Sequence, residues 1–450
     1  MAINRPLMAH KSRITCFGSR ESLQFHFSRR LLRLICTAMR WPRYLYKPLS
    51  VYHSNALLIL LQFIAVCNGF CYHRGRFIAN RWTKLFTVIF PIFILGSICL
   101  CLQQLLDNPE YSALIYERDQ FILVLCTLEL LMSTGCYVIM ICSMLRQANS
   151  HVALYDRINA LDQKLMREFG ANLNYHKLML KNGIQVSLLA LVYLAAISLA
   201  MKQALPNANQ YLVGSLVFLY AAITGGLHVT CYMHSNFAEM LRVRFRLLQK
   251  LLDANYLRKM FPQSPRRTAS LHSLVDMVRT LHEFIDSVNE VHRVGLSVGV
   301  AHDFMTVITV LYLVFGHSLG ERVDYTFLAQ GILWLFLPLH KFITAPVYCD
   351  MAIKEGKRCL RLVEHIDIRF PNVKSAKLLV ETTMHWCLSN KFEFTCGLNM
   401  IYNRTIIATI TAVIFNYLLV VIQFRMTQLM GEQMGEQKTQ MQDWIWIMND

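Results

Sequence analysis

Seven apolar stretches, each about as long as the 20 residues that a helix needs to cross a bilayer, constrain this chain most. They are Lys84–Leu106, Gln120–Leu145, Gly183–Ala204, Gln210–Met233, Leu296–Gly316, Phe327–Ala345 and Thr405–Phe424. An eighth stretch, Ala56–Cys71, is shorter and contains Gln62, Asn68 and Gly69. The pattern predicts an all-α membrane protein with seven transmembrane helices.

The composition supports an apolar solvent. The chain of 450 residues is 55% hydrophobic and only 16% charged, whereas soluble domains carry about 25% charged residues. The net charge is +17, but no basic run is long or interleaved with aromatic residues, so we expect no nucleic-acid partner. The first fifty residues are basic, and their apolar runs are too short and interrupted for a cleavable secretory signal.

The distribution of positive charge predicts the orientation. Of the 45 Lys and Arg residues, 39 lie in residues 1–84, 146–182, 234–295 and 348–404, which a seven-span topology places on one side. The positive-inside rule then predicts a cytoplasmic N-terminus and an extracellular C-terminus. If Ala56–Cys71 also crossed the membrane, the ten positive charges of residues 1–53 would lie outside. We therefore interpret it as an interfacial or re-entrant helix, and whether it inserts stays open.

The long loops on the cytoplasmic side look helical. Residues 271–291 repeat apolar side chains at three- and four-residue steps, which is one helix face: Leu271, Leu274, Val278, Leu281, Ile285 and Val288. We expect this face to pack against residues 146–182 and 348–400, forming an anchor. The predicted organisation is a cytoplasmic region with the interfacial helix at 1–83, spans one to six with helical loops at 84–345, the anchor at 346–404, helix seven at 405–424 and an extracellular tail at 425–450.

Signatures of enzymes and metal sites are missing from the sequence. It contains no Walker loop, no GxSxG and no HExxH motif, and no CxxC pair is matched by a pair of histidines. The fourteen cysteines fall in apolar segments or basic loops, which does not suggest an extracellular disulfide framework. We expect no catalytic residues, no metal and no cofactor.

The ionisable residues inside the predicted spans include Glu129 in the second, and His302 and Asp303 in the fifth. A buried charge in a membrane is costly, so each is a functional candidate by default. The alternative is that each is neutral, paired or facing a wet cavity for structural reasons. We expect His302 and Asp303 to pair poorly with each other, since adjacent helical residues point apart.

The last span carries a polar stripe. Thr409, Asn416 and Gln423 are seven residues apart and lie on nearly one helix face, while the other faces are apolar. Such a stripe faces either a wet lumen or another helix, and the pattern alone does not separate these readings. In a pore, Phe424 next to Gln423 could form a hydrophobic constriction that gates by dewetting.

The same span resembles a known family. The segment from Asn416 to Phe424 is similar to the insect gustatory receptor signature, in which Thr-Tyr, five apolar residues and Gln-Phe follow one another. Tyr417, Gln423 and Phe424 match it, and Asn416 replaces the threonine. The resemblance runs from about residue 55 to residue 424. The chain departs from the family in its long segment 1–50 and its tail after Phe424, and whether these ends are ordered stays open.

The resemblance implies a ligand-gated, non-selective cation channel, a homotetramer or a heterotetramer with other gustatory receptor subunits, in the plasma membrane of sensory neurons. Helix seven would line the pore through Thr409, Asn416, Tyr417, Gln423 and Phe424. A small tastant, bitter or aversive in the commonest case, with sugar or carbon dioxide as alternatives, would bind among spans two to six. Candidate pocket residues, each of which could instead be core, are Tyr193, Tyr220, Tyr312, Gln330 and Trp334.

Two other classes compete with this interpretation. A G-protein-coupled receptor also has seven spans, but its N-terminus is outside, and its acidic-Arg-Tyr and Asn-Pro-x-x-Tyr motifs are not found here. A transporter would show inverted repeats and broken helices, which the sequence does not display.

Overall fold

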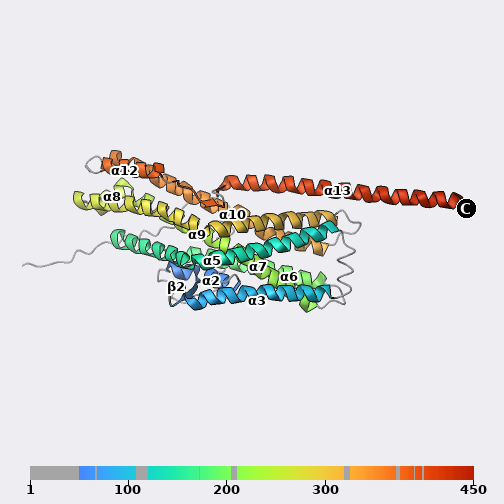
Figure 1. The fold of residues 1–450 in the computed structure, drawn as a ribbon. Coiled ribbons are helices and arrows are strands. Elements are labelled where there is room, and N and C mark those ends of the chain that lie inside the picture. Colours follow the sequence, from blue (N-terminus) through green and yellow to red (C-terminus); the bar gives the residue numbers. More distant parts are fainter. Residues whose placement is uncertain are drawn as a thin grey trace, which may run out of the picture.

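The computed structural model describes residues 50–65, 68–107, 120–171, 173–203, 210–318, 325–370, 376–389, 391–397 and 400–449. The expectations for residues 1–49, and for most of the short outer loops, lie outside this part of the chain. The described elements form one elongated bundle of roughly parallel and antiparallel helices (Figure 1).

In the part of the chain that the structure describes, seven helices are long and apolar enough to cross a membrane. They are α3 (Arg81–Leu106), α5 (Gln120–Phe169), α6 (His176–Gln203), α7 (Gln210–Leu251), α9 (Ser264–Ser318), α10 (Tyr325–Glu364) and α13 (Arg404–Asn449). Each contains one of the seven stretches identified in the sequence, apart from Ala204, which lies outside the described residues, so the seven-helix fold is confirmed. The side of the membrane on which each terminus lies stays a prediction.

Shorter elements connect the long helices. They are the helices α2 (Val51–Ala65), α8 (Ala254–Met260), α11 (Ile366–Arg369) and α12 (Ala376–Ser389), and two antiparallel strand pairs, β1 (Cys71–His73) with β2 (Arg76–Ile78) and β3 (Thr395–Cys396) with β4 (Met400–Ile401). The sequence interpretation did not include the strands, which are only two or three residues long.

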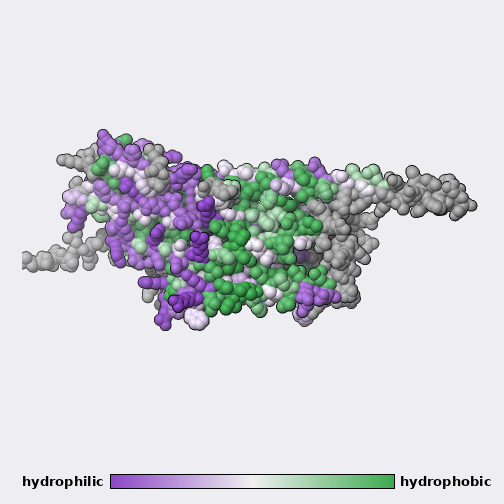
Figure 2. All heavy atoms as spheres, in the orientation of Figure 1, coloured by the Kyte–Doolittle hydropathy of each residue, from purple (hydrophilic) through white to green (hydrophobic). Residues whose placement is uncertain are grey.

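Four of the long helices, α5, α7, α9 and α10, extend well past their apolar stretches toward the same end of the molecule (Figure 1). Hydrophilic side chains cover this end, and hydrophobic side chains cover the middle of the bundle (Figure 2). All six apolar residues of the predicted face in 271–291 are buried there. Residue pairs such as Arg157 with Ser287 and Arg279 with Thr383 join α9 to α5 and to α12. The apolar face predicted from periodicity is therefore buried against neighbouring helices, and the role of this end as an anchor stays a prediction.

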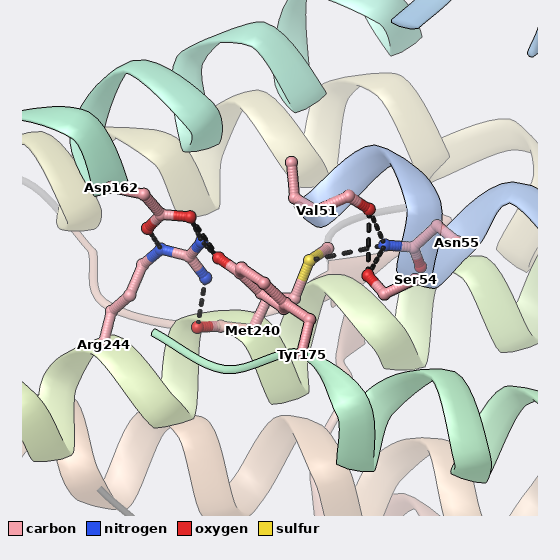
Figure 3. A network of polar contacts seen from close by, with 7 residues as sticks. All are labelled: Val51, Ser54, Asn55, Asp162, Tyr175, Met240 and Arg244. Carbon is pink, nitrogen blue, oxygen red and sulfur yellow. Dashed lines mark hydrogen bonds and ion pairs between the residues drawn. The ribbon is translucent and has the colours of Figure 1, made fainter. Parts of the chain in front are cut away.

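A buried ion pair holds the anchor together (Figure 3). Arg244 of α7 is fully buried, and its Nε and Nη2 lie 2.9 and 2.7 Å from the carboxylate oxygens of Asp162 on α5. Its Nη1 donates to the Met240 carbonyl at 2.7 Å. Tyr175, which precedes α6, donates its hydroxyl hydrogen to Asp162 and accepts from Arg244. Burial raises the pKa of Tyr175 well above its usual value, so the phenol keeps the proton that this network needs.

The helix α2 packs against α6 and α7 through polar side chains inside the bundle. Asn182 donates to the Ser54 carbonyl at 2.8 Å, and Asn236 donates to the Asn182 side chain at 2.7 Å. Asn55 reaches the Val51 carbonyl and the Met240 sulfur (Figure 3). The helix has 15 residues, fewer than a spanning helix needs. Its assignment as interfacial or re-entrant stays a prediction.

The structure differs from the sequence prediction at the C-terminal end of α13. The helix was expected to end at Phe424, yet it continues to Asn449 and leaves the bundle (Figure 1). Residues 425–449 contain no proline and are rich in Met and Gln, which are good helix formers. The end of helix seven was placed at Phe424 because the residues after it are less hydrophobic. A fall in hydrophobicity does not by itself end a helix.

The Arg244–Asp162 pair gives a stability prediction. The substitution Asp162→Asn leaves the buried guanidinium without its carboxylate and should destabilise the chain by about 3–5 kcal/mol. We expect a clear fall in the thermal midpoint of the detergent-purified protein. The midpoint is measured by heating samples and following the folded peak in size-exclusion chromatography. The control is Lys164→Met, which breaks an exposed pair with Asp276 and should cost at most about 1 kcal/mol. An equal effect of the two substitutions would contradict the structural role of Asp162.

Candidate ligand site and pore helix

A small enclosed cavity lies among α6, α7, α9 and α10 in the apolar part of the bundle. Its volume is about 10 Å³, room for about one water molecule. The lining residues are Tyr193, Thr224, His228, His302, Thr306, Trp334, Leu337 and Pro338. Apolar walls with a few polar tips are typical of small-molecule sites, although this cavity is far smaller than a ligand-filled one.

Two of the five predicted pocket residues, Tyr193 and Trp334, line this cavity, and a third, Tyr220, packs against Trp334. The ring of Trp334 lies 5.8 Å from that of Tyr193 and 5.4 Å from that of Tyr220, edge to face in both cases. The Tyr193 hydroxyl lies 2.8 Å from the Thr224 hydroxyl. Helices α6, α7 and α10 therefore each supply one aromatic ring to the same place.

The other two predicted pocket residues do not line the cavity. Tyr312 is buried on α9, nearly two helical turns beyond Thr306. Gln330 is half-buried on α10, one turn before Trp334. Their choice rested on residue type and depth along the span, which do not specify the direction of a side chain.

Glu129 of α5 adjoins this aromatic group. Its Oε1 accepts hydrogen bonds from Ser133 and Thr306, each at 3.1 Å, and from the Tyr220 hydroxyl. The sequence interpretation singled out Glu129 because it is an acid in a span. It did not connect Glu129 with Tyr220 or Thr306, which lie 91 and 177 residues away in the chain.

Asp303 forms an ion pair that the sequence interpretation missed. Its Oδ2 lies 2.5 Å from Lys341 Nζ of α10, and both residues are buried. The neighbouring His302 also reaches Asp303, with 3.2 Å between Nδ1 and Oδ1, so the expectation that the two would pair poorly was incomplete. Lys341 is the only Lys or Arg in the sixth predicted span. The sequence alone could have indicated this ion pair, because a single acid and a single base inside a membrane are expected to pair with each other.

The polar stripe of α13 lies on the surface of the single chain. Thr409, Asn416 and Gln423 are all exposed, and Phe424 is 61% exposed. The apolar part of α13 is 11% buried, compared with 22–50% for the other six spanning helices. Its main contacts are with α9 and α10, and they include the Tyr417 ring, which lies edge-on 5.5 Å from Phe304.

A second, larger cavity of about 460 Å³ opens between α3, α6 and α7. Its lining includes Tyr211 and Phe218, which are 80% and 61% exposed, so the cavity faces the outside of the bundle. None of the predicted pocket residues lies on its wall. Within the described residues, no group of three or more His, Cys, Asp or Glu side chains could hold a metal ion.

A sequence profile of a seven-helix receptor family, described as 7tm chemosensory receptor, matches residues 54–428. The chain belongs to the 7tm chemosensory receptor family. This is a family of receptors and not of enzymes, and it confirms the resemblance seen at Asn416–Phe424. Together with the seven spanning helices, it makes the chain a multi-pass membrane protein.

Two curated Drosophila melanogaster proteins are similar to this receptor over most of their length. A candidate gustatory receptor, 57a, is 37% identical over 407 residues, which cover 89% of this chain and 98% of the relative. A second candidate, gustatory receptor 47b, is 21% identical over 374 residues, 81% of this chain and 89% of the relative.

Solved structures show the same fold. The insect olfactory receptor OR5 from Machilis hrabei, solved alone and in complex with eugenol, superposes with TM-scores of 0.54 and 0.53. The alignment covers 82% of this chain and 97% of OR5, at 9% sequence identity. At this identity the likeness establishes the fold alone.

The Asp303–Lys341 pair gives a second prediction. Because each charge neutralises the other in a buried site, Lys341→Met or Asp303→Asn alone should destabilise the receptor by about 3–5 kcal/mol. The double variant should lose clearly less free energy of unfolding than the sum of the losses in the two single variants. Thermal midpoints of the four purified proteins complete the double-mutant cycle. Additive losses would show that the two charges are not coupled.

Proposed function

We propose that this receptor is a subunit of a ligand-gated, non-selective cation channel that detects a small tastant. The observation that carries the proposal is α13, an apolar helix that leaves most of its surface and its whole polar stripe uncovered in the single chain. Unsatisfied polar side chains do not face hydrocarbon without a partner or water. Several copies of α13 around a common axis would cover the apolar faces and turn the stripes toward a wet lumen.

In such an assembly, Gln423 and Phe424 would form the gate at the outer end of the apolar part of α13. Phe424 would supply the hydrophobic constriction, and Asn416 and Thr409 would line the conduit below it. Tyr417 lies beside this stripe, and its contact with Phe304 ties the pore helix to its own bundle. Movement of α9 could therefore reach α13 through this pair of rings.

The tastant would bind where Tyr193, Tyr220 and Trp334 meet. The cavity there holds about one water molecule, so side chains must move when a ligand enters. The larger cavity fits this role less well, because its wall faces the outside of the bundle. A bitter or aversive tastant is the proposed class, and a sugar or carbon dioxide is the alternative.

The proposed setting is the plasma membrane of sensory neurons, with a cytoplasmic N-terminus and four subunits, either identical or mixed with other gustatory receptors. The anchor at 346–404 and the cytoplasmic ends of the long helices would join the subunits. The tail at 425–450 would lie outside. The charge distribution supports this orientation, and it argues against a G-protein-coupled receptor, the second candidate, whose N-terminus is outside.

The pore assignment is tested by Gln423→Ala in cells that give ligand-evoked current, with the receptor expressed alone or with a partner subunit. Removing the amide from the narrowest part of the conduit should change ion permeability ratios or shift the ligand concentration for half-maximal current several-fold. The matched control is Thr411→Ala, on the opposite face of α13, where the hydroxyl bonds only to the Ile407 carbonyl. A conducting Gln423→Ala channel with unchanged permeation and gating would contradict the assignment.

A further inference from the structure

We propose that Glu129 makes the pocket a site for a ligand that carries a protonated nitrogen. The inference rests on the proposed function, because it names the chemical class of the tastant. It starts from the contrast between the two acids of the apolar bundle, Glu129 and Asp303.

Asp303 has a cationic partner, whereas Glu129 has none among the residues that the structure describes. Asp303 lies 2.5 Å from Lys341 Nζ. Among the described residues, the ion pairs within 4.0 Å do not include Glu129. An acid without a counter-ion in a membrane span is costly, and such acids mark sites that bind cations or protons.

The hydrogen bonds of Glu129 leave one oxygen available. Among the described residues, its three hydrogen-bond donors are the hydroxyls of Ser133, Tyr220 and Thr306, and all three point to Oε1. These donors come from α5, α7 and α9, so the carboxylate is held in place by three helices. Within the described part of the chain, Oε2 has no hydrogen-bond donor, and it is the atom that would accept from an ammonium group.

The aromatic rings next to Glu129 suit the same ligand. Tyr220, which donates to Glu129, lies 5.4 Å from Trp334, and Tyr193 lies 5.8 Å from the same ring. A cation over the face of Trp or Tyr gains about 0.5–2 kcal/mol. A carboxylate beside such rings binds an organic ammonium better than a hydrated inorganic ion, because the rings also bury the carbon atoms of the ligand.

The nearby basic groups do not cancel this preference. Lys341 is held by Asp303. His228 and His302 line the cavity, and their ring centroids are 6.5 Å apart. His228 bonds to the Thr224 carbonyl and His302 to Asp303. Glu129 is therefore the carboxylate of this region whose charge is not balanced by a protein side chain.

The test compares two probes of equal shape, phenethylamine and 2-phenylethanol, on the purified full-length receptor. Binding is measured by isothermal titration calorimetry at pH 7 in potassium chloride and, separately, in sodium chloride. The wild-type receptor should bind the amine at least about tenfold more tightly than the alcohol, a difference of 1.4 kcal/mol. Glu129→Gln keeps the shape of the side chain, and it should bring the ratio of the two affinities close to one.

The controls separate charge from folding. Glu168→Gln makes the same change on the same helix, at an exposed site that bonds to Ser273 in the anchor, and should keep the preference. Glu129→Asp keeps the charge and should retain part of the preference, which decides the case if Glu129→Gln does not fold.

Four results would overturn the inference: no binding of either probe, equal binding of both by the wild-type receptor, an unchanged ratio in Glu129→Gln, or loss of the preference in sodium chloride alone. The last would show that the carboxylate holds a sodium ion. None of these results depends on current through the channel. A receptor that conducts without preferring the amine would contradict this inference and leave the proposed function intact.

Discussion

The structure depends on the rule that polar groups inside a bilayer must find their partners within the protein. Three groups of contacts in the bundle follow it. Near the anchor, Asn55, Asn182 and Asn236 bond to one another among α2, α6 and α7. Deeper in the apolar part, Lys341 neutralises Asp303, and hydroxyls from three helices surround Glu129. These contacts join helices far apart in the sequence, and they fix which faces of α5, α7, α9 and α10 point inward.

The helix α13 is the exception, and the exception points to function. Six spanning helices cover one another, whereas α13 keeps its apolar faces and its stripe of Thr409, Asn416 and Gln423 on the surface. A single chain leaves this surface unexplained. In the proposed channel, association of copies around α13 would cover it and create a conduit. The proposed ligand site would then lie one helix away from the pore wall, since α9 carries both Thr306 of the cavity and Phe304 beside α13.

The sequence predicted the features that depend on local pattern. Hydropathy located the seven spans, and the three- and four-residue period located the buried face of 271–291, because both are properties of one helix. The sequence did not predict the contacts between helices that are far apart in the chain. These are the ion pair of Lys341 with Asp303 and the hydrogen bonds of the Tyr220 and Thr306 hydroxyls to Glu129. Depth along a span selected Tyr193, Tyr220 and Trp334, whose rings contact one another, but it does not specify which way a side chain points, as Tyr312 and Gln330 show. The helical continuation to Asn449 was missed because polarity alone does not end a helix.

The most direct test of this account is the mass of the receptor complex extracted from membranes, measured by native mass spectrometry in detergent. If copies of α13 cover one another, the complex of identical chains should have four times the 52.2 kDa mass of one chain. Replacing apolar residues of α13 with charged ones should shift it to smaller species. A receptor that conducts ligand-evoked current while its extracted form has the mass of a single chain would contradict the central claim.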